Sequence, residues 1–393
     1  MPAGGPPSGK VLITSATAQV GGTERIMLML SRTLSQRGID VATVFPEDSG
    51  AQEVLTWFRQ EGVDADASPV VRSLYQSHGL RDVLRFADFV RRSGAAVVNL
   101  HYGGNHISLK DVVAVRLSGK RCVVQVHDAD EIEEPRKRRM TALAGRLADA
   151  VVVATPVSRD ILARTGVPLG RISVVPCGLT PPALLPTRNE ARSRLDLAAS
   201  TFVVSSLARL TPNKGMAMLI EAVSRLPDQP SLRLLIAGEG RDKQRVESLG
   251  RELLGDRFRM LGRIPEPEYL YAASDVFALA SRSEGFGLVF VEAAFQSVPS
   301  VAMDVGGVRH AVLNGETGLL VMRDDVEGFA AAIERLRRDP ELRFKMGAAA
   351  RSRALQELSA SSMVDRYAQV LGVGSGRLEE QSDAAAAVRV ERR

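Results

Sequence analysis

The sequence lacks the features of an exported, disulfide-stabilised or membrane-spanning protein. Among its 393 residues are only two cysteines, Cys122 and Cys177, so no disulfide framework is expected and a reducing compartment is the simpler interpretation. The first residues, MPAGGPPSG, contain no apolar core of the kind that a signal peptide needs. No apolar run approaches the ~20 residues that a membrane-spanning helix requires. Together these absences predict a cytoplasmic protein.

An excess of charge of one sign is lacking as well. The 51 Lys and Arg and the 46 Asp and Glu leave a net charge of +5, and most of them alternate along expected helix faces, which is typical of a solvated surface. No basic block is interleaved with aromatic residues, and no helix-turn-helix or zinc-finger spacing occurs, so nucleic acid is not an expected partner. The small basic surplus suits an anionic ligand, whether a phosphate, a nucleotide or a lipid headgroup.

What is present is a repeated alternation of apolar, strand-like runs with amphipathic helical stretches. The composition, 45% hydrophobic and 25% charged residues, is that of a globular protein, and the length predicts two domains. The expected strands are 10–16, 41–45, 95–101, 121–127, 150–154 and 172–176, followed by 202–208, 232–237, 258–261, 276–280, 301–303 and 318–321. Continuously apolar strands joined by helices indicate parallel sheets covered on both faces. The predicted fold class is therefore α/β, with two Rossmann-like, doubly wound parallel-sheet domains.

A proline-rich segment without periodicity, LTPPALLPTRN, separates the two sets of strands and is typical of an interdomain linker. The predicted organisation is a disordered N-terminus (1–9), an N-terminal domain (10–178), the linker (179–189), a C-terminal domain (190–355), a helix that crosses back to the N-terminal domain (356–371) and a disordered tail (372–393). Open α/β sheets bind ligands outside the carboxyl ends of their strands. Two such domains facing each other predict a ligand site in the cleft between them.

Two positions in the first half are candidates for ligand binding. Gly22 follows Gly21 between the first strand and its helix, where glycines let backbone amides approach a phosphate at the positive end of the helix. A simple tight turn explains these glycines equally well. His127 ends the apolar run VVQVH, and the carboxyl end of a parallel strand points into the crevice. His101, at the end of the preceding strand, is a weaker candidate of the same kind.

Four charged residues in the second half form the clearest candidate site. Arg209 and Lys214 flank the loop in LARLTPNKG, and two cations there can neutralise a diphosphate without a metal ion. Glu284 precedes an expected helix, and Glu292 lies inside that helix on an apolar stretch. Their separation is at most about 12 Å at helical rise, comparable to the reach from a sugar to a ribose across a diphosphate. A carboxylate buried at position 292 needs a polar partner, such as ribose hydroxyls.

Together these features resemble the retaining glycosyltransferases of family 4, which have the two-domain GT-B architecture. The resemblance covers nearly the whole chain and is densest between residues 207 and 321. It rests on the motifs LARLTPNKG, LLIAGEG, LGRI, EGFGLVFVE and DVGGVRHAVLNGETGLLV, which follow the family's order and spacing. One such motif would be weak, whereas five in order are specific.

The resemblance implies a nucleoside-diphosphate sugar, UDP- or GDP-linked, as the donor, with no cofactor and no metal ion. It implies catalytic roles for His127, Glu284, Arg209 and Lys214. The residues implied in donor binding are Gly22, Arg209, Lys214, Gly238, Arg263, Ile264, Glu284, Gly285, Phe286, Gly287, Leu288 and Glu292. The two cations would hold the diphosphate, Glu292 the ribose and Glu284 the transferred sugar, while the chain around Arg263 would contact the base.

The family retains the anomeric configuration of the hexose-type sugar that it transfers. The resemblance implies a same-face substitution in which the departing phosphate helps to take the acceptor proton. Stabilisation of the leaving group by Arg209, Lys214 and helix dipoles would then be the main catalytic contribution. The acceptor would offer a hydroxyl group of a glycan, a lipid-linked compound or a natural product. Its expected contacts are Tyr102, Gly103, Asn105 and His127.

Several alternatives stay open at this point. The linker entrance reads PCGLT at 176–180, where the family often has PNGVD, so the resemblance implies the donor site but not the hinge-side contacts. The main alternative is a sugar-nucleotide-binding GT-B protein without transferase activity, such as an epimerase-like enzyme or an idle paralogue. A phosphorylase would need a pyridoxal lysine and a longer chain. The basic stretch 136–139 is more typical of a solvated helix face, and peripheral contact with the inner face of a membrane is its alternative interpretation.

Overall fold

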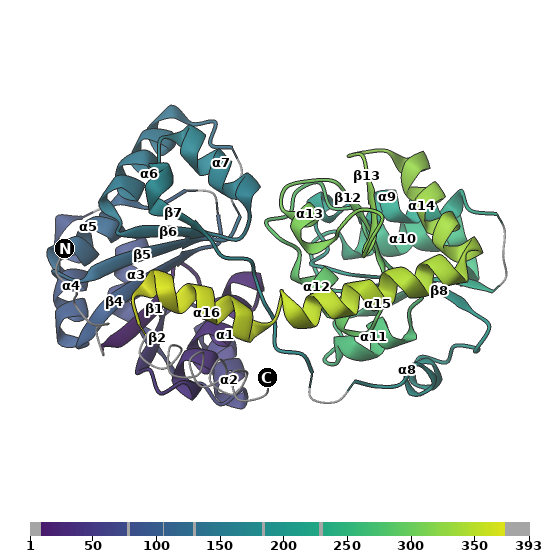
Figure 1. Ribbon diagram of the computed structural model, residues 1–393, viewed down its shortest axis with the longest axis horizontal. Coiled ribbons are helices and arrows are strands. Elements are labelled where there is room, and N and C mark those ends of the chain that lie inside the picture. Colours follow the sequence, from purple (N-terminus) through teal and green to yellow (C-terminus); the bar gives the residue numbers. More distant parts are fainter. Residues whose placement is uncertain are drawn as a thin grey trace, which may run out of the picture. The chain divides into compact units, whose positions relative to one another are not determined.

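The chain forms two compact units, each built on one parallel β-sheet, in a computed structural model (Figure 1). The structure describes residues 9–76, 79–104, 106–128, 131–182, 185–227 and 231–373, so most of the two terminal segments predicted to be disordered lies outside the described residues. The N-terminal unit contains the chain up to Cys177 and again from Ala360 onwards, and the C-terminal unit is Gly178–Ser359. The predicted α/β class with two Rossmann-like sheets is confirmed.

The N-terminal unit has a seven-stranded parallel sheet in the order β3-β2-β1-β4-β5-β6-β7. The strands are β1 (Lys10–Ser15), β2 (Val41–Pro46), β3 (Ala65–Ser68), β4 (Ala95–Tyr102), β5 (Arg121–Val126), β6 (Ala150–Val153) and β7 (Ile172–Val174). Because β1 lies between β2 and β4, the strand order reverses beside it, and such a switch point is where open α/β sheets bind ligands. The sequence did not predict β3, whose four residues ADAS contain no apolar run.

Helices cover both faces of this sheet. They are α1 (Gly22–Gln36), α2 (Ala51–Gln60), α3 (Pro69–Gln76), α4 (Leu80–Arg92), α5 (Leu109–Leu117), α6 (Pro135–Leu147), α7 (Pro156–Thr165) and α16 (Ala360–Leu371). Helix α16 comes from the far end of the chain and packs beside α1 (Figure 1). An ion pair of 2.7 Å between Arg37 and Asp365 joins the two at their surface.

The two faces of β4 differ in chemistry, because alternate side chains of a strand point to opposite faces. Val98, Leu100 and Tyr102 belong to an apolar core with residues of α4 and α5. Asn99 and His101 point to the other face and are fully buried there. Burying polar groups is costly unless they are hydrogen-bonded, so these two side chains require partners within the fold.

The C-terminal unit has a six-stranded parallel sheet in the order β10-β9-β8-β11-β12-β13. The strands are β8 (Phe202–Leu207), β9 (Leu232–Ala237), β10 (Phe258–Gly262), β11 (Val276–Leu279), β12 (Ser300–Met303) and β13 (Gly318–Val321). The order reverses at β8, which lies between β9 and β11. The loops that follow β8 and β11 therefore flank the switch point of this sheet.

The helices of the C-terminal unit are α8 (Arg188–Arg194), α9 (Met216–Ser224), α10 (Lys243–Leu254), α11 (Pro267–Ala273), α12 (Leu288–Phe295), α13 (Val308–Ala311), α14 (Val326–Arg338) and α15 (Pro340–Gln356). Helix α15 packs along α12 (Figure 1). Helix α8 begins inside the segment that the sequence suggested as a linker. Its start is fixed by a capping box between Thr187 and Glu190, which satisfies backbone amides that the helix leaves unpaired.

A buried ion cluster fixes α8 to the sheet. Asp275, directly before β11, accepts hydrogen bonds from Arg192 on α8 at 2.9 Å and from the backbone amide of Val203 on β8 at 2.8 Å. Arg192 is 3% exposed and also donates to the carbonyls of Ala198 and Ala199. The charges of Arg192 and Asp275 are thus paired and hydrogen-bonded, which offsets the free-energy cost of removing them from water.

Candidate functional site

The loops after β8 and β11 bring two of the predicted site residues into direct contact. Lys214 Nζ lies 2.6 Å from Glu284 Oε1, although 70 positions separate the residues in sequence. Lys214 ends the short 3₁₀ turn Pro212–Lys214 after β8, and the backbone amide of Arg282 donates to the Asn213 carbonyl at 2.8 Å. The loops after the neighbouring strands β8 and β11 thus place a basic and an acidic side chain in direct contact.

Gly215 is what lets the two loops approach each other. Its φ is +66°, a left-handed conformation that side chains disfavour. A Cβ atom at this position would lie 1.9 Å from the Ala280 carbonyl oxygen at the end of β11. Only glycine therefore fits between Lys214 and the start of α9.

Glu284 is held from several directions. Its Oε1 also accepts a hydrogen bond of 2.7 Å from Ser281, and its backbone carbonyl accepts one of 2.9 Å from the Gly307 amide after β12. Its side chain is only 11% exposed. The position of this carboxylate is therefore fixed by the ends of three adjacent strands.

The segment between Glu284 and α12 contains the other predicted backbone contacts. Gly285, Gly287 and Leu288 are partly exposed, whereas Phe286 is buried and anchors the turn. Helix α12 begins at Leu288 after the left-handed Gly287. Its first backbone amides and its positive dipole end are the features with which a helix start stabilises an anion.

Glu292 has a partner within the protein. It is 8% exposed, and its Oε2 accepts a hydrogen bond of 2.6 Å from the hydroxyl of Tyr271 on α11. A carboxylate offers up to about four acceptor positions, so this bond leaves acceptor capacity for a ligand. The sequence predicted that a carboxylate buried here must be paired but did not predict Tyr271.

The predicted donor residues Arg209, Gly238, Arg263 and Ile264 lie on the loops after β8, β9 and β10. Arg209 is exposed, and within the described residues its guanidinium makes no ion pair. The Gly238 amide donates to the Gly262 carbonyl at 2.7 Å, which joins the second and third loops. Ile264 packs, with Leu207 and Leu261, on a buried apolar cluster that includes Val203 and Leu235. The three loops are thus tied together at the carboxyl edge of the sheet.

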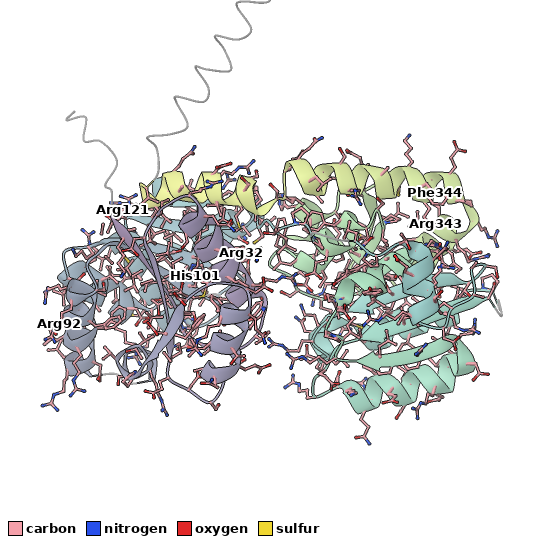
Figure 2. The ribbon with its side chains drawn as sticks, turned by 90° about the horizontal axis from the view of Figure 1, so that it is seen from below. Arg32, Arg92, His101, Arg121, Arg343 and Phe344 are labelled. Carbon is pink, nitrogen blue, oxygen red and sulfur yellow. The ribbon has the colours of Figure 1, made fainter. Side chains whose placement is uncertain are left out.

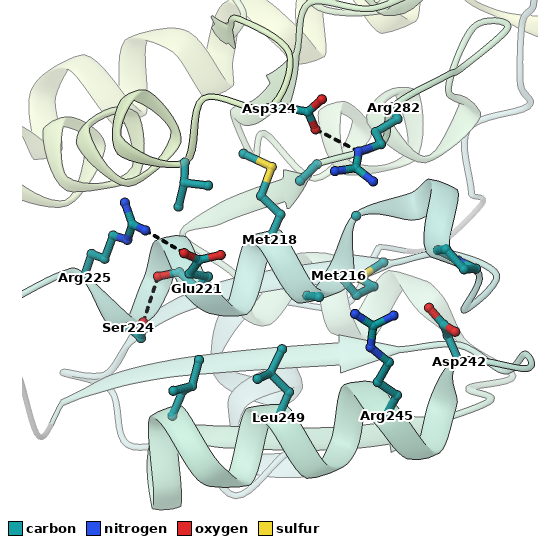
Figure 3. Close-up of a pocket in the computed structure, with 16 residues that line it drawn as sticks. Met216, Met218, Glu221, Ser224, Arg225, Asp242, Arg245, Leu249, Arg282 and Asp324 are labelled. Atoms are coloured by element: carbon teal, nitrogen blue, oxygen red, sulfur yellow. Dashed lines mark hydrogen bonds and ion pairs between the residues drawn. The ribbon is translucent and has the colours of Figure 1, made fainter.

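A surface groove of about 690 Å³ lies nearby but contains none of these donor residues (Figure 3). It opens between α9 and α10, and its lining includes Met216, Met218, Arg225, Arg245 and Arg282. Two of these cations are paired with acids, Arg225 with Glu221 at 2.5 Å and Arg282 with Asp324 at 2.8 Å. We therefore place the candidate site at the strand-end loops, where the charges converge, and not in this groove.

In the N-terminal unit, the residues predicted to bind ligands gather at the carboxyl ends of β1, β4 and β5. Gly22 is the exposed first residue of α1. A Cβ atom on Gly103, in the loop after β4, would lie 3.3 Å from the hydroxyl of Thr23, so this loop contacts the start of α1. The His127 amide donates to the Tyr102 carbonyl at 3.0 Å. Asn105, the remaining predicted acceptor contact, lies outside the described residues.

The side chain of Tyr102 is buried within the N-terminal unit and hydrogen-bonded there. Its side chain is 4% exposed, and its hydroxyl donates to Asp111 on α5 at 2.8 Å. Burial raises the pKa of Asp111 to about 6, against the hydrogen bond from Tyr102, which lowers it. The side chain of Tyr102 therefore belongs to the core, which does not favour the acceptor contact that the sequence predicted for it.

His127 is hydrogen-bonded to a second histidine that the sequence ranked as a weaker candidate. His101 Nδ1 lies 2.9 Å from His127 Nε2, and His101 Nε2 lies 2.8 Å from Asn99 Oδ1. Burial lowers the pKa of His127 to about 3 and that of His101 well below its usual value. Both rings are therefore neutral at physiological pH. Asn99 was missed, although a polar residue inside an apolar strand is a visible signal.

Two further properties concern metal binding and membranes. In the part of the chain that the structure describes, no three His, Cys, Asp or Glu side chains cluster as a metal ion would require. None of the described helices combines the length and apolar character needed to cross a membrane. Cys122 and Cys177 are buried, and burial raises the pKa of both thiols, which makes them poor nucleophiles.

Two family models match the chain and divide it much as its two units do. The model described as "Glycosyltransferase Family 4" matches residues 20–181, and the model described as "Glycosyl transferases group 1" matches residues 187–353.

Curated relatives and solved structures agree with these matches. A D-inositol 3-phosphate glycosyltransferase of Xylanimonas cellulosilytica is 30% identical over 90% of this chain and 93% of its own. A GDP-mannose-dependent alpha-(1-6)-phosphatidylinositol monomannoside mannosyltransferase of Mycolicibacterium smegmatis is 30% identical over 70% of this chain and 75% of its own. Two others, of Rhizobium meliloti and Corynebacterium aurimucosum, match over only 52% and 58% of their own length. Anabaena HepE in complex with UDP has the same fold, with a TM-score of 0.80 at 21% identity over 92% of this chain and 99% of that one.

The two doubly wound units, each with a cluster of polar loops at the switch point of its sheet, define an enzyme of the GT-B class. The chain belongs to glycosyltransferase family 4. Its activity is that of a glycosyltransferase of the hexosyl-transferring type.

Proposed function

We propose that this chain transfers a hexose-type sugar from a nucleoside-diphosphate sugar to an acceptor hydroxyl with retention of anomeric configuration. The observation that carries the proposal is the contact between Lys214 and Glu284 at the switch point of the C-terminal sheet. An ammonium group has three N–H donors, so Lys214 can keep its bond to Glu284 and still contact a phosphate. Glu284, fixed by Ser281 and the Gly307 amide, then offers acceptor positions to sugar hydroxyls.

The main chemical contribution of the site is stabilisation of the departing diphosphate. Arg209 and Lys214 would neutralise its growing charge, together with the start of α12. Glu284 is engaged by a cation and a hydroxyl, which suits a hydrogen-bond acceptor better than a nucleophile. This supports a same-face substitution without a covalent sugar–enzyme intermediate. Glu292 and the chain at Arg263 would bind the ribose and the base.

The donor is proposed to carry UDP or GDP. HepE was solved with UDP, and the M. smegmatis relative depends on GDP-mannose. Phosphatidylinositol derivatives and inositol phosphate occur in the names of relatives, which favours testing phosphorylated polyols and their lipids first among acceptors.

The proposal is tested by incubating the purified protein with UDP-, GDP-, ADP- and TDP-sugars, with and without inositol phosphate, and measuring nucleoside diphosphate release. Release from one class of donor, followed by NMR of the product showing the donor's own anomeric configuration, is the expected result. An inverted product would contradict the same-face mechanism. Conversion of the sugar nucleotide into an epimer without release would favour the epimerase-like alternative.

We further propose that α6 docks on an anionic membrane surface. Met140, Leu143 and Leu147 are 40%, 43% and 40% exposed, and their spacing places them on one stripe of the helix. The exposed cations at 136–139 lie on the same helix. An exposed apolar stripe bordered by cations is the pattern of helices that lie in a lipid interface.

Vesicle sedimentation tests this surface. The protein is expected to bind phosphatidylcholine vesicles that contain phosphatidylglycerol and to lose most binding in Leu143→Glu. The matched control is Phe344→Glu, since Phe344 on α15 is 71% exposed but is not part of α6 (Figure 2). Equal binding by Leu143→Glu and the native chain would exclude α6 as the docking surface.

A further inference from the structure

A continuous string of buried side chains runs from α16 to His127. Tyr367 on α16 donates its hydroxyl hydrogen to Gln125 Oε1 at 2.6 Å, and the neighbouring Asn99 side chain lowers the pKa of Tyr367 against burial, which raises it. Asn99 contacts His101, and His101 contacts His127. All members except His127 are at most 2% exposed, and His101 lies inside the N-terminal unit (Figure 2).

Backbone carbonyls fix the direction in which every hydrogen bond of this string points. The Asn99 amide nitrogen lies 3.3 Å from the Val123 carbonyl, and the Gln125 amide nitrogen lies 3.4 Å from the Val126 carbonyl. A carbonyl can only accept, so both amides must turn their NH₂ groups towards the backbone. Asn99 Oδ1 then faces His101 and accepts from it. The opposite orientation would leave two buried carbonyl acceptors facing two amide oxygens.

The protonation of both rings follows from this direction. His101 is neutral and donates from Nε2 to Asn99, so its Nδ1 carries a lone pair and accepts from His127 Nε2. His127 therefore holds its proton on Nε2, and its Nδ1 carries a lone pair. The other form of His127 would place two lone pairs against each other across 2.9 Å in a buried setting, where an unmade hydrogen bond is costly.

We propose that Asn99, His101 and Tyr367 are positioning residues that hold His127 in one tautomer, so that it meets its ligand as a hydrogen-bond acceptor. Such an acceptor recognises a hydroxyl group of the sugar or of the acceptor and discriminates against an anionic oxygen. This inference rests on the proposed function for the identity of the ligand, but the tautomer itself does not depend on that function. The C-terminal helix, which is remote in sequence, thereby supports the site through Tyr367.

The tautomers are measured directly by ¹⁵N NMR of the imidazole groups in histidine-labelled native protein. The sequence has five histidines, and the resonances of His101 and His127 are assigned from His101→Gln and His127→Gln. Both rings are expected to carry their proton on Nε2 alone. A proton on Nδ1 of either ring would overturn the proposal, because reversing the string puts both protons there. The result is independent of any enzymatic activity and so separates this proposal from the proposed function.

Kinetics test the consequence for activity, with the sugar nucleotide that is turned over in the donor panel. His101→Leu breaks the string and is expected to lower kcat/KM by about 10-fold, the value of one hydrogen bond of about 1.5 kcal/mol. His101→Gln supplies an oxygen to accept from His127 and an NH₂ group to donate to Asn99, so it is expected to restore most activity. Tyr367→Phe should cause a smaller loss.

The control is Asp365→Asn, which removes the surface ion pair between α16 and α1 without touching the string. It is expected to leave the kinetic constants unchanged. Equal activities of His101→Leu and His101→Gln, both folded by circular dichroism, would show that His101 acts only by filling space and would overturn the positioning role.

Discussion

At the scale of single residues, the candidate site consists of charged side chains that lie close together and are largely buried, which costs free energy of folding. Lys214 and Glu284 are each mostly buried and directly paired, and Glu292 is buried against Tyr271. Burying charged groups is unfavourable unless they are hydrogen-bonded. Their convergence at the ends of β8 and β11 is what distinguishes this site from the many exposed ion pairs of the surface.

Lys214→Ala is expected to lower kcat/KM by about 100-fold or more, because loss of a positioned donor to a developing charge typically costs about 3 kcal/mol. Steady-state kinetics with the active sugar nucleotide measure this effect. Lys345→Ala is the matched control, since Lys345 is an exposed lysine of α15. Native kinetics in Lys214→Ala would remove this residue from the mechanism.

Glu292→Ala is expected to weaken binding of the nucleoside diphosphate by about 10- to 100-fold, since hydrogen bonds to a charged group contribute about 1.5–3 kcal/mol. Isothermal titration calorimetry measures this affinity. Tyr271→Phe removes one hydrogen bond to the carboxylate but keeps the carboxylate, and it should retain most of the affinity. Unchanged affinity in Glu292→Ala would contradict the ribose role.

At the scale of helices, strands and loops, the sequence predicted what depends on local pattern. The strands β4 and β5 were predicted because apolar residues dominate both of them, although Asn99, His101 and Gln125 are polar. β3 was missed, since its short sequence ADAS owes its conformation to pairing with β2. The hydrogen bond between Tyr367 and Gln125 joins residues 242 positions apart, and no local pattern encodes such a contact.

The candidate site likewise combines features that local motifs predict with features that they cannot predict. Lys214, Glu284 and Glu292 were predicted as site residues because they occur in motifs of fixed spacing. The direct contact between Lys214 and Glu284, and the partner of Glu292, depend on the order of strands in the sheet. Strand order is a property of the whole unit and was therefore not available from the individual motifs.

Gly215→Ala tests how far the approach of two loops determines the site. A non-glycine residue in the left-handed region costs about 1–2 kcal/mol, and the new Cβ would also meet the Ala280 carbonyl at 1.9 Å. We expect a loss of stability greater than that and a fall in activity, because Lys214 must shift. Denaturant unfolding and kinetics on the same preparation check both.

The control is Gly38→Ala at the end of α1. Gly38 has φ of +79° but no atom within 4 Å of the added Cβ, so this variant incurs only the conformational cost. It should lose about 1 kcal/mol and retain full activity. Equal losses of stability in the two variants would show that the contact with Ala280 does not constrain the loop.

At the scale of the whole molecule, each unit has its own buried core, and the C-terminal unit also contains the buried ion cluster around Asp275. Asp275→Ala leaves the buried Arg192 without its counter-charge, which typically costs about 3–5 kcal/mol. We expect a lower urea midpoint in circular dichroism. The single tryptophan, Trp57, lies on α2 of the N-terminal unit, so its fluorescence reports that unit separately.

Asp88→Ala is the control for this prediction. It breaks the exposed pair between Asp88 and Arg92 on α4, and exposed pairs contribute at most about 1 kcal/mol. An unchanged midpoint in Asp275→Ala would mean that the cluster around Asp275 contributes nothing to the stability of the C-terminal unit.

Hydrogen–deuterium exchange with and without a saturating nucleoside diphosphate, UDP or GDP, tests the central claim most directly. We expect slower exchange in the segments 209–216, 238–240, 262–264 and 284–292, which form the loops and helix starts at the switch point of the C-terminal sheet. Protection confined to α9 and α10 around the groove of Figure 3, or confined to the N-terminal unit, would contradict it.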